Sequence, residues 1–233
     1  MKYVVSLVLG ILAGVLILLA VLYYNPLTAR NTLSPLSVSD NEIITFRYSA
    51  VAADALVFTN DGESQIKPNP PKVLQLWEPT VRLTNSMVTI LRDSRNNPAA
   101  IGIKISSESE KTNIVDGNVI VDSVWHIYVP GRGSLFVEQQ ENYWGYVREI
   151  VIPAYWSSGD SWRGNWTGNI TSGPGALGTA RVVGGSGVFL GLVTDGVESL
   201  RAEAYSVDAG PVAMDAELTI ELPRIEATLT PDP

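Results

Sequence analysis

The first 25 residues of the chain contain one long apolar segment. From Val4 to Tyr24 the only polar exception is Ser6, and no residue is charged. These 21 residues, at about 1.5 Å per residue, make a helix of roughly 30 Å, which matches the hydrocarbon core of a bilayer. A cleaved signal peptide, the alternative, has a shorter apolar region that ends in small residues. Here the segment ends at Tyr23-Tyr24-Asn25-Pro26, so the pattern predicts an uncleaved single-pass signal-anchor over residues 1–25.

Beyond a Ser-, Asn- and Pro-rich tether predicted over residues 26–41, the pattern changes to a period of two. In Ala216–Leu222 every second residue is apolar, while Glu217, Thr219 and Glu221 are polar. Glu198–Tyr205 repeats this pattern, with Leu200, Ala202 and Ala204 expected to face a core. Such alternation is typical of strands that are buried on one face.

The remaining segments extend this interpretation to roughly eight to ten strands separated by Gly, Pro, Asn and Asp. No amphipathic helix of ordinary length is expected. The pattern predicts a mainly β domain over residues 42–223, an antiparallel β-barrel with a β-sandwich as the alternative, followed by a tail at 224–233. The further predicted strands are Glu42–Ser49, Lys72–Trp77, Thr80–Leu91, Ile101–Ile105, Val119–Val129, Ser134–Glu138, Tyr146–Pro153, Gly178–Val183 and Gly187–Thr194.

Composition narrows the chemistry. The 233 residues include no cysteine and a single histidine, so disulfides, thiol catalysis and sites that need two histidines are excluded. The net charge of −8 argues against a nucleic-acid partner. No catalytic, cofactor-binding or metal-binding residues can be assigned, and no cofactor is expected. The protein is therefore more readily interpreted as non-catalytic than as an enzyme.

His126 is the one candidate for a titrating group. It lies in the predicted strand Val119–Val129, which is apolar on both faces and therefore predicted to be a central strand. His126 and Tyr128 share one face of this strand and could line a barrel lumen. The favoured alternative is a structural or surface histidine, because no second histidine or nucleophile motif accompanies it.

Two further features indicate contacts with partners. Gly10 and Gly14 have the spacing that lets membrane helices approach closely, so they are predicted to pack against another transmembrane helix. Between Trp144 and Trp166 the chain is rich in Trp, Tyr and Gly, a composition typical of protein interfaces. One or two of these aromatic residues are expected in the core. The predicted interface residues are Tyr143, Trp144, Tyr155, Trp156, Trp162 and Trp166.

A glycine-rich run is predicted to form a tight hairpin with close backbone packing. Its residues Gly185-Ser186-Gly187-Val188-Phe189-Leu190-Gly191 resemble a signature of allene oxide cyclase-like and dirigent-like barrels. The resemblance covers about the last fifty residues. It implies an eight-stranded antiparallel barrel with an apolar cavity, and it assigns no catalytic residue.

These observations predict a single-pass, membrane-anchored, non-catalytic accessory or structural subunit. Its helix would contact membrane lipid and other transmembrane proteins, and its aromatic-rich segment would bind protein partners. The cationic flank at Lys2 favours a cell (inner) membrane location with the domain on the extracytoplasmic, periplasmic side. The alternatives are an anchored barrel that binds an apolar small molecule and a cyclase-like enzyme.

Overall fold

The chain begins with the predicted helix. The structure, a computed structural model, describes residues 2–24, 42–51, 56–60, 84–171 and 179–222. Helix α1 (Lys2–Tyr24) contains a stretch, Tyr3–Val21, that is long and apolar enough to cross a membrane. None of this stretch is buried against other described residues. The predicted tether, the predicted tail and the predicted strand Lys72–Trp77 lie outside the described residues.

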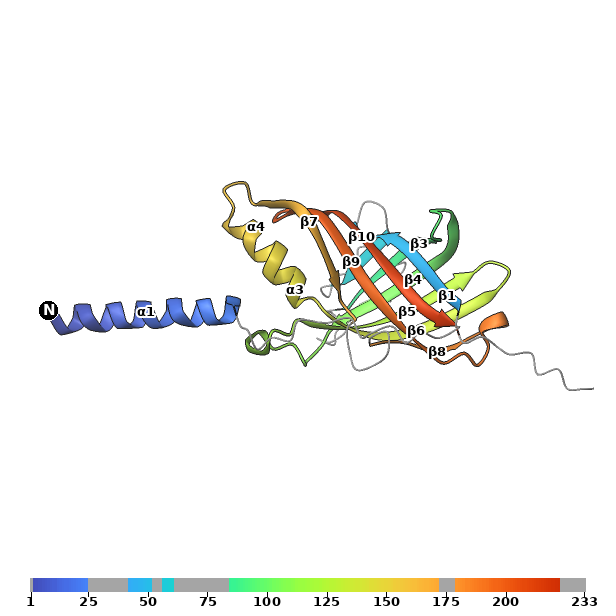
Figure 1. Cartoon of the computed structure of the whole chain (residues 1–233), viewed down its shortest axis with the longest axis horizontal. Coiled ribbons are helices and arrows are strands. Elements are labelled where there is room, and N and C mark those ends of the chain that lie inside the picture. Colours follow the sequence, from blue (N-terminus) through green and yellow to red (C-terminus); the bar gives the residue numbers. More distant parts are fainter. Residues whose placement is uncertain (1, 25–41, 52–55, 61–83, 172–178, 223–233) are drawn as a thin grey trace, which may run out of the picture.

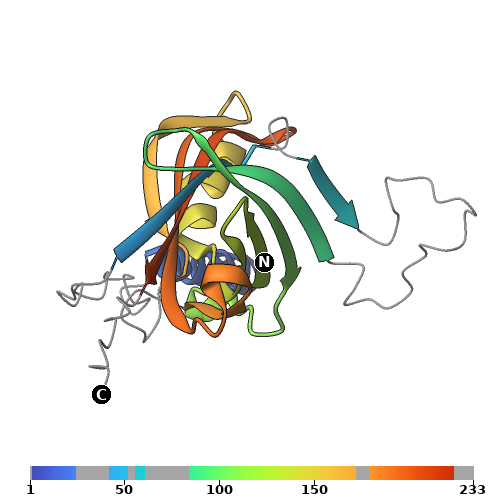
Figure 2. The same ribbon diagram turned by 90° about the vertical axis from the view of Figure 1, so that its right-hand side faces the viewer.

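Eight antiparallel strands close into a barrel, which Figure 2 shows from one end. The strand order is β1-β10-β9-β8-β6-β5-β4-β3, and a pairing of Arg47 with Arg92 joins β3 back to β1. This closed sheet confirms the predicted barrel and excludes the sandwich. The strands are β1 (Glu42–Ser49), β3 (Thr84–Arg92), β4 (Pro98–Glu108), β5 (Ile120–Val129), β6 (Gly133–Asn142), β8 (Ala180–Gly185), β9 (Thr194–Ser206) and β10 (Gly210–Leu222).

Two more strands extend this sheet. β2 (Leu56–Asn60) pairs with β3. β7 (Ser161–Asn169) pairs with the second half of β9, and β8 pairs with the start of β9. β7 and β8 therefore lie on the same side of β9, with β8 along its first residues and β7 along its second half.

The strands bury alternate residues as the period-two pattern requires. In β10, Ala216, Leu218 and Ile220 are at most 3% exposed, and the partly exposed Glu217 lies between two of them. In β9, Leu200 and Ala202 are likewise buried. Leu200 and the three β10 residues join side chains from the other strands in one core cluster within the barrel, whereas Ala202 packs in a second cluster with Tyr146 and Ile150. The faces predicted for these two strands are thus confirmed.

Helical structure follows β6, where the sequence predicted the strand Tyr146–Pro153. One turn of α-helix, α3 (Trp144–Tyr146), continues into a π-helical turn, η3 (Val147–Val151), and then into α4 (Ile152–Trp156). Tyr146, Ile150 and Ala154 are buried at a spacing of four, which is the spacing of one helix face. The strand prediction was wrong because β-branched and aromatic residues dominate this segment, whereas packing of that face determines the structure.

The glycine-rich run forms the turn between β8 and β9. Residues Gly187–Phe189 make a short 3₁₀-helix, η4, so the predicted strand Gly187–Thr194 is wrong. The close packing is confirmed, because a Cβ atom on Gly187 would collide with the Arg132 carbonyl oxygen. Gly187 also has a φ of 62°, which favours glycine.

The two ends of the barrel differ. One end, called the Glu42 end below, contains the start of β1 and the paired end of β10, together with η4 and the β5–β6 turn at Arg132. The helical segment Trp144–Trp156 lies at the opposite end (Figure 1).

Candidate functional site

A cluster of charged side chains occupies the barrel interior. Lys104 on β4 lies between two carboxylates, and its Nζ is 2.8 Å from Oε1 of both Glu141 on β6 and Glu198 on β9. The side chain of Lys104 is 7% exposed, and both glutamates are fully buried. We call this group, together with the side chains that hydrogen-bond to it, the interior cluster. Its members are Tyr48, Lys104, Ser123, Trp125, Gln139, Glu141, Tyr143 and Glu198.

Neutral donors complete the shell around Glu198. Tyr48 donates its hydroxyl hydrogen to Oε1, the oxygen that also accepts from Lys104. Trp125 donates from Nε1 to Oε2 over 3.2 Å, and Gln139 donates from Nε2 to the same oxygen. Each oxygen of Glu198 therefore accepts two hydrogen bonds.

Glu141 has a similar shell. Its Oε1 accepts from Lys104, from the Ser123 hydroxyl and from Gln139 Nε2, the last over 2.6 Å. Its Oε2 accepts from the Tyr143 hydroxyl over 2.6 Å. Within the cluster, Gln139 Oε1 is a buried acceptor without a hydrogen-bond partner among the described residues.

These contacts set the protonation states. Burial by itself raises the pKa of the Glu141 carboxyl, but the Lys104 charge and the hydrogen bonds from Lys104, Ser123 and Tyr143 outweigh it and leave the pKa below the ordinary 4.5. For Lys104, burial lowers the pKa, and the charges of Glu141 and Glu198 more than reverse this, so that the pKa lies above 10.5. Glu141 and Lys104 are therefore both charged at neutral pH and form a buried ion pair.

The interior cluster links five strands of the barrel through side-chain contacts inside it. Its members come from β1, β4, β5, β6 and β9, with Tyr143 immediately following β6. Because buried ions need their partners, the cluster favours the strand register that brings these side chains together. It has little contact with solvent, since Lys104 is its most exposed ion. A buried network of this kind suits a structural role better than contact with a substrate.

The interior cluster is not among the sites predicted from the sequence. One available signal was the period of β9, since Glu198 shares the face of Leu200 and Ala202. In β4 the burial pattern places Lys104 inside, whereas Ile103 and Ile105 face out. Gly102 also faces inward, next to the Trp125 ring, where a Cβ atom would lie only 2.7 Å from the ring.

His126 and Tyr128 do not line the lumen. They share one face of β5, as the spacing required, but this is the outer face, and Tyr128 is 50% exposed. Trp125 and Ile127 occupy the inner face with no exposure. The lumen assignment was wrong because both faces of this strand carry apolar residues, so periodicity alone could not decide which face is buried. β5 is a central strand, as predicted, because it pairs with β4 on one side and with β6 on the other, but only one of its faces is buried.

Instead, His126 belongs to an apolar surface on the outside of the barrel. Its ring stacks on Phe136 of β6, with ring centres 4.7 Å apart and 8° between the planes. Ile103 of β4 is its register partner on the other side. The surrounding apolar side chains are between 36% and 53% exposed. We call this surface the outer apolar face, and it consists of Ile90, Ile101, Ile103, Ile105, Val124, His126, Tyr128 and Phe136.

The aromatic-rich segment separates into buried and exposed residues. Tyr143 is part of the interior cluster, and Trp144 is only 8% exposed, so neither can form a docking surface as predicted. Trp162 and Trp166 are partly buried against Tyr146 and Ala202.

Two of the predicted interface residues, Tyr155 and Trp156 at the end of α4, are largely exposed, at 59% and 76%. The difference arises because the helical segment turns one face of this region inward.

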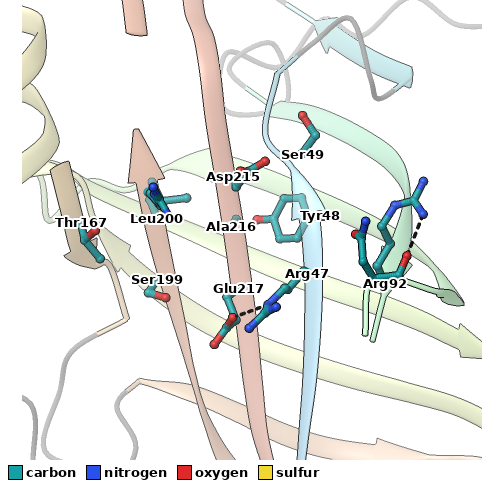
Figure 3. A pocket seen from close by; sticks show the side chains of 12 residues that line it. Arg47, Tyr48, Ser49, Arg92, Thr167, Ser199, Leu200, Asp215, Ala216 and Glu217 are labelled. Atoms are coloured by element: carbon teal, nitrogen blue, oxygen red, sulfur yellow. Dashed lines mark hydrogen bonds and ion pairs between the residues drawn. The ribbon is translucent and has the colours of Figure 1, made fainter. Parts of the chain in front are cut away.

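A groove crosses another part of the outer wall, and Figure 3 shows its lining. It has a volume of about 590 Å³ and is bordered by β1, β3, β7, β9 and β10. Arg47 donates from Nε to Glu217 Oε2 over 2.7 Å, and Arg92 donates to the Asn96 carbonyl oxygen over 3.2 Å (Figure 3). Charged side chains of both signs line the groove, which therefore does not resemble an apolar ligand cavity.

Comparison with solved structures finds distant likenesses. The chain is similar to a pterocarpan synthase dirigent protein of known structure, at 10% identity and a TM-score of 0.32, over 80% of this chain and 88% of that chain. No protein-family model matches the sequence. No curated protein matches it either.

The remaining predicted site residues lie on α1. A Cβ atom added to Gly10 or Gly14 would meet nothing within 4 Å among the described residues. Their role in packing against a partner helix therefore stays a prediction. No group of three or more His, Asp or Glu side chains in the described part of the chain is placed to hold a metal ion.

Proposed function

We propose that the protein is a single-pass membrane-anchored, non-catalytic subunit whose barrel binds a protein partner through the outer apolar face. The observation that carries this proposal is the distribution of polarity across the barrel wall. Charged groups form a hydrogen-bonded cluster inside, whereas eight neighbouring side chains outside make a largely apolar surface. Contiguous exposed apolar surface on a soluble domain is typical of interaction sites.

The anchor supports the membrane part of this proposal. Tyr3–Val21 is long and apolar enough to span a bilayer, and Lys2 precedes it. Cationic flanks tend to stay in the cytoplasm, so the proposed arrangement places the barrel on the extracytoplasmic side of the cell membrane. Through Gly10 and Gly14, α1 would also pack against other transmembrane helices.

The arrangement of polar groups favours protein binding over the two alternatives. An apolar-ligand carrier requires an apolar cavity, and the 590 Å³ groove has a charged lining on the outer wall. A cyclase-like enzyme requires His126 or a carboxylate that faces a substrate cavity. His126 faces outward, and both interior carboxylates already accept hydrogen bonds on each oxygen.

The test has two parts. Alkaline carbonate treatment of membranes should leave the protein in the pellet, and the mature protein should retain residues 1–25 by intact mass. The full chain, purified in mild detergent, should then co-purify with a protein partner or a second, differently tagged copy.

Ile103→Asp should abolish that co-purification, since it places a charge in the outer apolar face. The control is Val212→Asp, because Val212 on β10 is also an exposed apolar residue, at 52% against 36% for Ile103, but lies outside this face. Release by carbonate would contradict the anchor, and equal co-purification by both variants would contradict the binding surface.

A further inference from the structure

The outer apolar face has the layout of an interface core. It covers four adjacent strands, β3 to β6, and three successive register rows. One row contains Ile90, Ile101 and Tyr128, and the next contains Ile103, His126 and Phe136. The third row pairs Ile105 with Val124. The stacked rings of His126 and Phe136 therefore lie near its centre.

Its size can be worked from sheet geometry. Along the strands the face covers four residue steps, and across the sheet it covers three strand spacings. Each of these is about 14 Å between the outermost Cα atoms. With the width of the side chains included, the area of the face is on the order of 400 Å². A stable interface buries about 800 Å² on each partner. The polar rim must supply the rest of the contact, so its charges decide which partner fits.

The rim carries opposite charges at its two ends. Arg132, in the β5–β6 turn, and Arg95, in the β3–β4 turn, follow the face at the Glu42 end, and the Arg132 guanidinium lies 5.1 Å from the centre of the Phe189 ring. Asp122 on β5 and Glu138 on β6 border it at the opposite end, two residues beyond Val124 and Phe136 respectively. All four residues are exposed.

Each end also contains charge of the other sign, which is Asp93 at the Glu42 end and Lys111 and Arg181 at the opposite end. At the Glu42 end, Asp93 accepts hydrogen bonds from the backbone N–H groups of Arg95 and Asn97, so its carboxylate is engaged within the turn. At the opposite end, Arg181 is the register partner of Glu138, and its Nε lies 3.8 Å from Asp195. Asp122 likewise accepts a hydrogen bond from Gln140 Nε2 over 2.9 Å, and the Lys111 charge lowers the pKa of its carboxyl. The charge pattern that the inference uses is that of Arg95 and Arg132 at the Glu42 end and of Asp122 and Glu138 at the opposite end.

We propose that a second copy of this chain packs on the outer apolar face, with its strands running in the opposite direction. A twofold axis in the contact plane and perpendicular to the strands superposes β5 of one copy on β5 of the other. This rotation brings Arg132 of one copy close to Asp122 of the other. An axis parallel to the strands would instead place like charges together.

The proposal rests on the proposed function, because it names the partner for the same surface. The axis passes close to His126, so the two His126–Phe136 stacks meet at the centre of the interface. Apolar side chains then form the dry core, and two symmetry-related pairs of Arg132 and Asp122 close its ends.

The first experiment measures the oligomeric state of the full chain in mild detergent by sedimentation velocity. We expect a dimer, and Ile103→Asp should raise its dissociation constant on the order of thirtyfold or more, the effect of losing one interface hot spot. Val212→Asp should leave it unchanged. Replacing both Gly10 and Gly14 by Leu in a parallel variant removes self-association through α1, and the dimer should persist.

The second experiment tests the antiparallel arrangement by charge reversal. Arg132→Glu and Asp122→Arg should each weaken the dimer, and the two together should restore it, because each copy then supplies both reversed charges. Restoration also shows that the single variants fold. The chain has no cysteine, so His126→Cys introduces a unique thiol. Sheets that pack face to face lie about 10 Å apart, within reach of a short bis-maleimide that should link two copies. Val212→Cys is the unlinked control.

The outcomes separate this inference from the proposed function. A monomer whose residue 126 links to a different protein overturns self-association, while the function as a protein-binding subunit stands. A dimer lost only in the Gly10 and Gly14 variant also overturns it, because the helices then hold the copies together. A monomer without any protein linked to residue 126 overturns both proposals.

Discussion

Replacing Lys104 by Met should destabilise the barrel strongly and in a pH-dependent way. The substitution removes the only cation of the interior cluster and leaves Glu141 and Glu198 as two buried carboxylates. Breaking a buried ion pair by removing one partner costs about 3–5 kcal/mol. Since domains of this size are stable by about 5–15 kcal/mol, the variant should be marginally stable at pH 7.

The sign of the pH dependence follows from the carboxylates. In the native protein the pKa of Glu141 is lowered below 4.5, so its contribution is present above that pH and is lost as the pH falls further. In Lys104→Met the burial that raises the pKa of this carboxyl is no longer opposed by the lysine charge. Acidification then protonates the carboxylate in the folded state and relieves the penalty. The stability difference between the two proteins should narrow from pH 8 to pH 5.

The assay is urea unfolding of the full chain in mild detergent, followed by tryptophan fluorescence. Arg47→Met is the matched control, because it also removes a cation 2.7 Å from a glutamate, but the two side chains are 50% and 39% exposed. An exposed pair of this kind contributes about 0–1 kcal/mol. If both substitutions cost the same, or if the deficit of Lys104→Met is unchanged between pH 8 and pH 5, the account of the interior cluster is refuted.

Three further predictions concern glycines and aromatic residues. Gly187→Ala should lower stability by at least about 1–2 kcal/mol, because φ is 62° and the added Cβ meets the Arg132 carbonyl oxygen. Gly184→Ala is the control, since a Cβ atom there meets nothing within 4 Å among the described residues, and it should have little effect on the thermal melting temperature. Trp166→Ala should lower the free energy of unfolding by about 2–3 kcal/mol, because its ring packs on Tyr146. Trp156 is 76% exposed, so Trp156→Ala should change the free energy of unfolding by no more than about 0.5 kcal/mol. Equal melting temperatures for the two variants would contradict this prediction. Gly14→Leu should weaken co-purification of a partner helix and leave the melting temperature of the barrel unchanged.

The fold could be predicted where one segment contains its own signal. The apolar run of α1 and the alternation of β10 each determine an element from neighbouring residues, and β1 was predicted with its observed bounds, Glu42–Ser49. The helical segment Trp144–Trp156 was missed because its Val, Ile and Tyr residues favour strands locally. Its buried face depends on Ala202 and Trp166, which lie later in the chain.

The candidate site was harder to predict because it depends on strand pairing. Lys104, Glu141 and Glu198 are far apart in the sequence and meet only when the sheet closes. In β5, apolar residues on both faces left the direction of His126 undetermined, and only burial of Trp125 decides it. The outer apolar face was missed for the same reason, since its isoleucines in β4 resemble core residues until Lys104 is seen to face inward.

Photo-crosslinking in intact membranes identifies what lies against the outer apolar face. A photoreactive residue placed at Ile103 samples the outer apolar face, and the same residue at Val212 samples exposed surface elsewhere on the barrel. We expect a discrete protein adduct from position 103 in the membrane fraction and none from position 212. The proposed function would be contradicted if position 103 gave no protein adduct while the chain remained folded and present in the membrane.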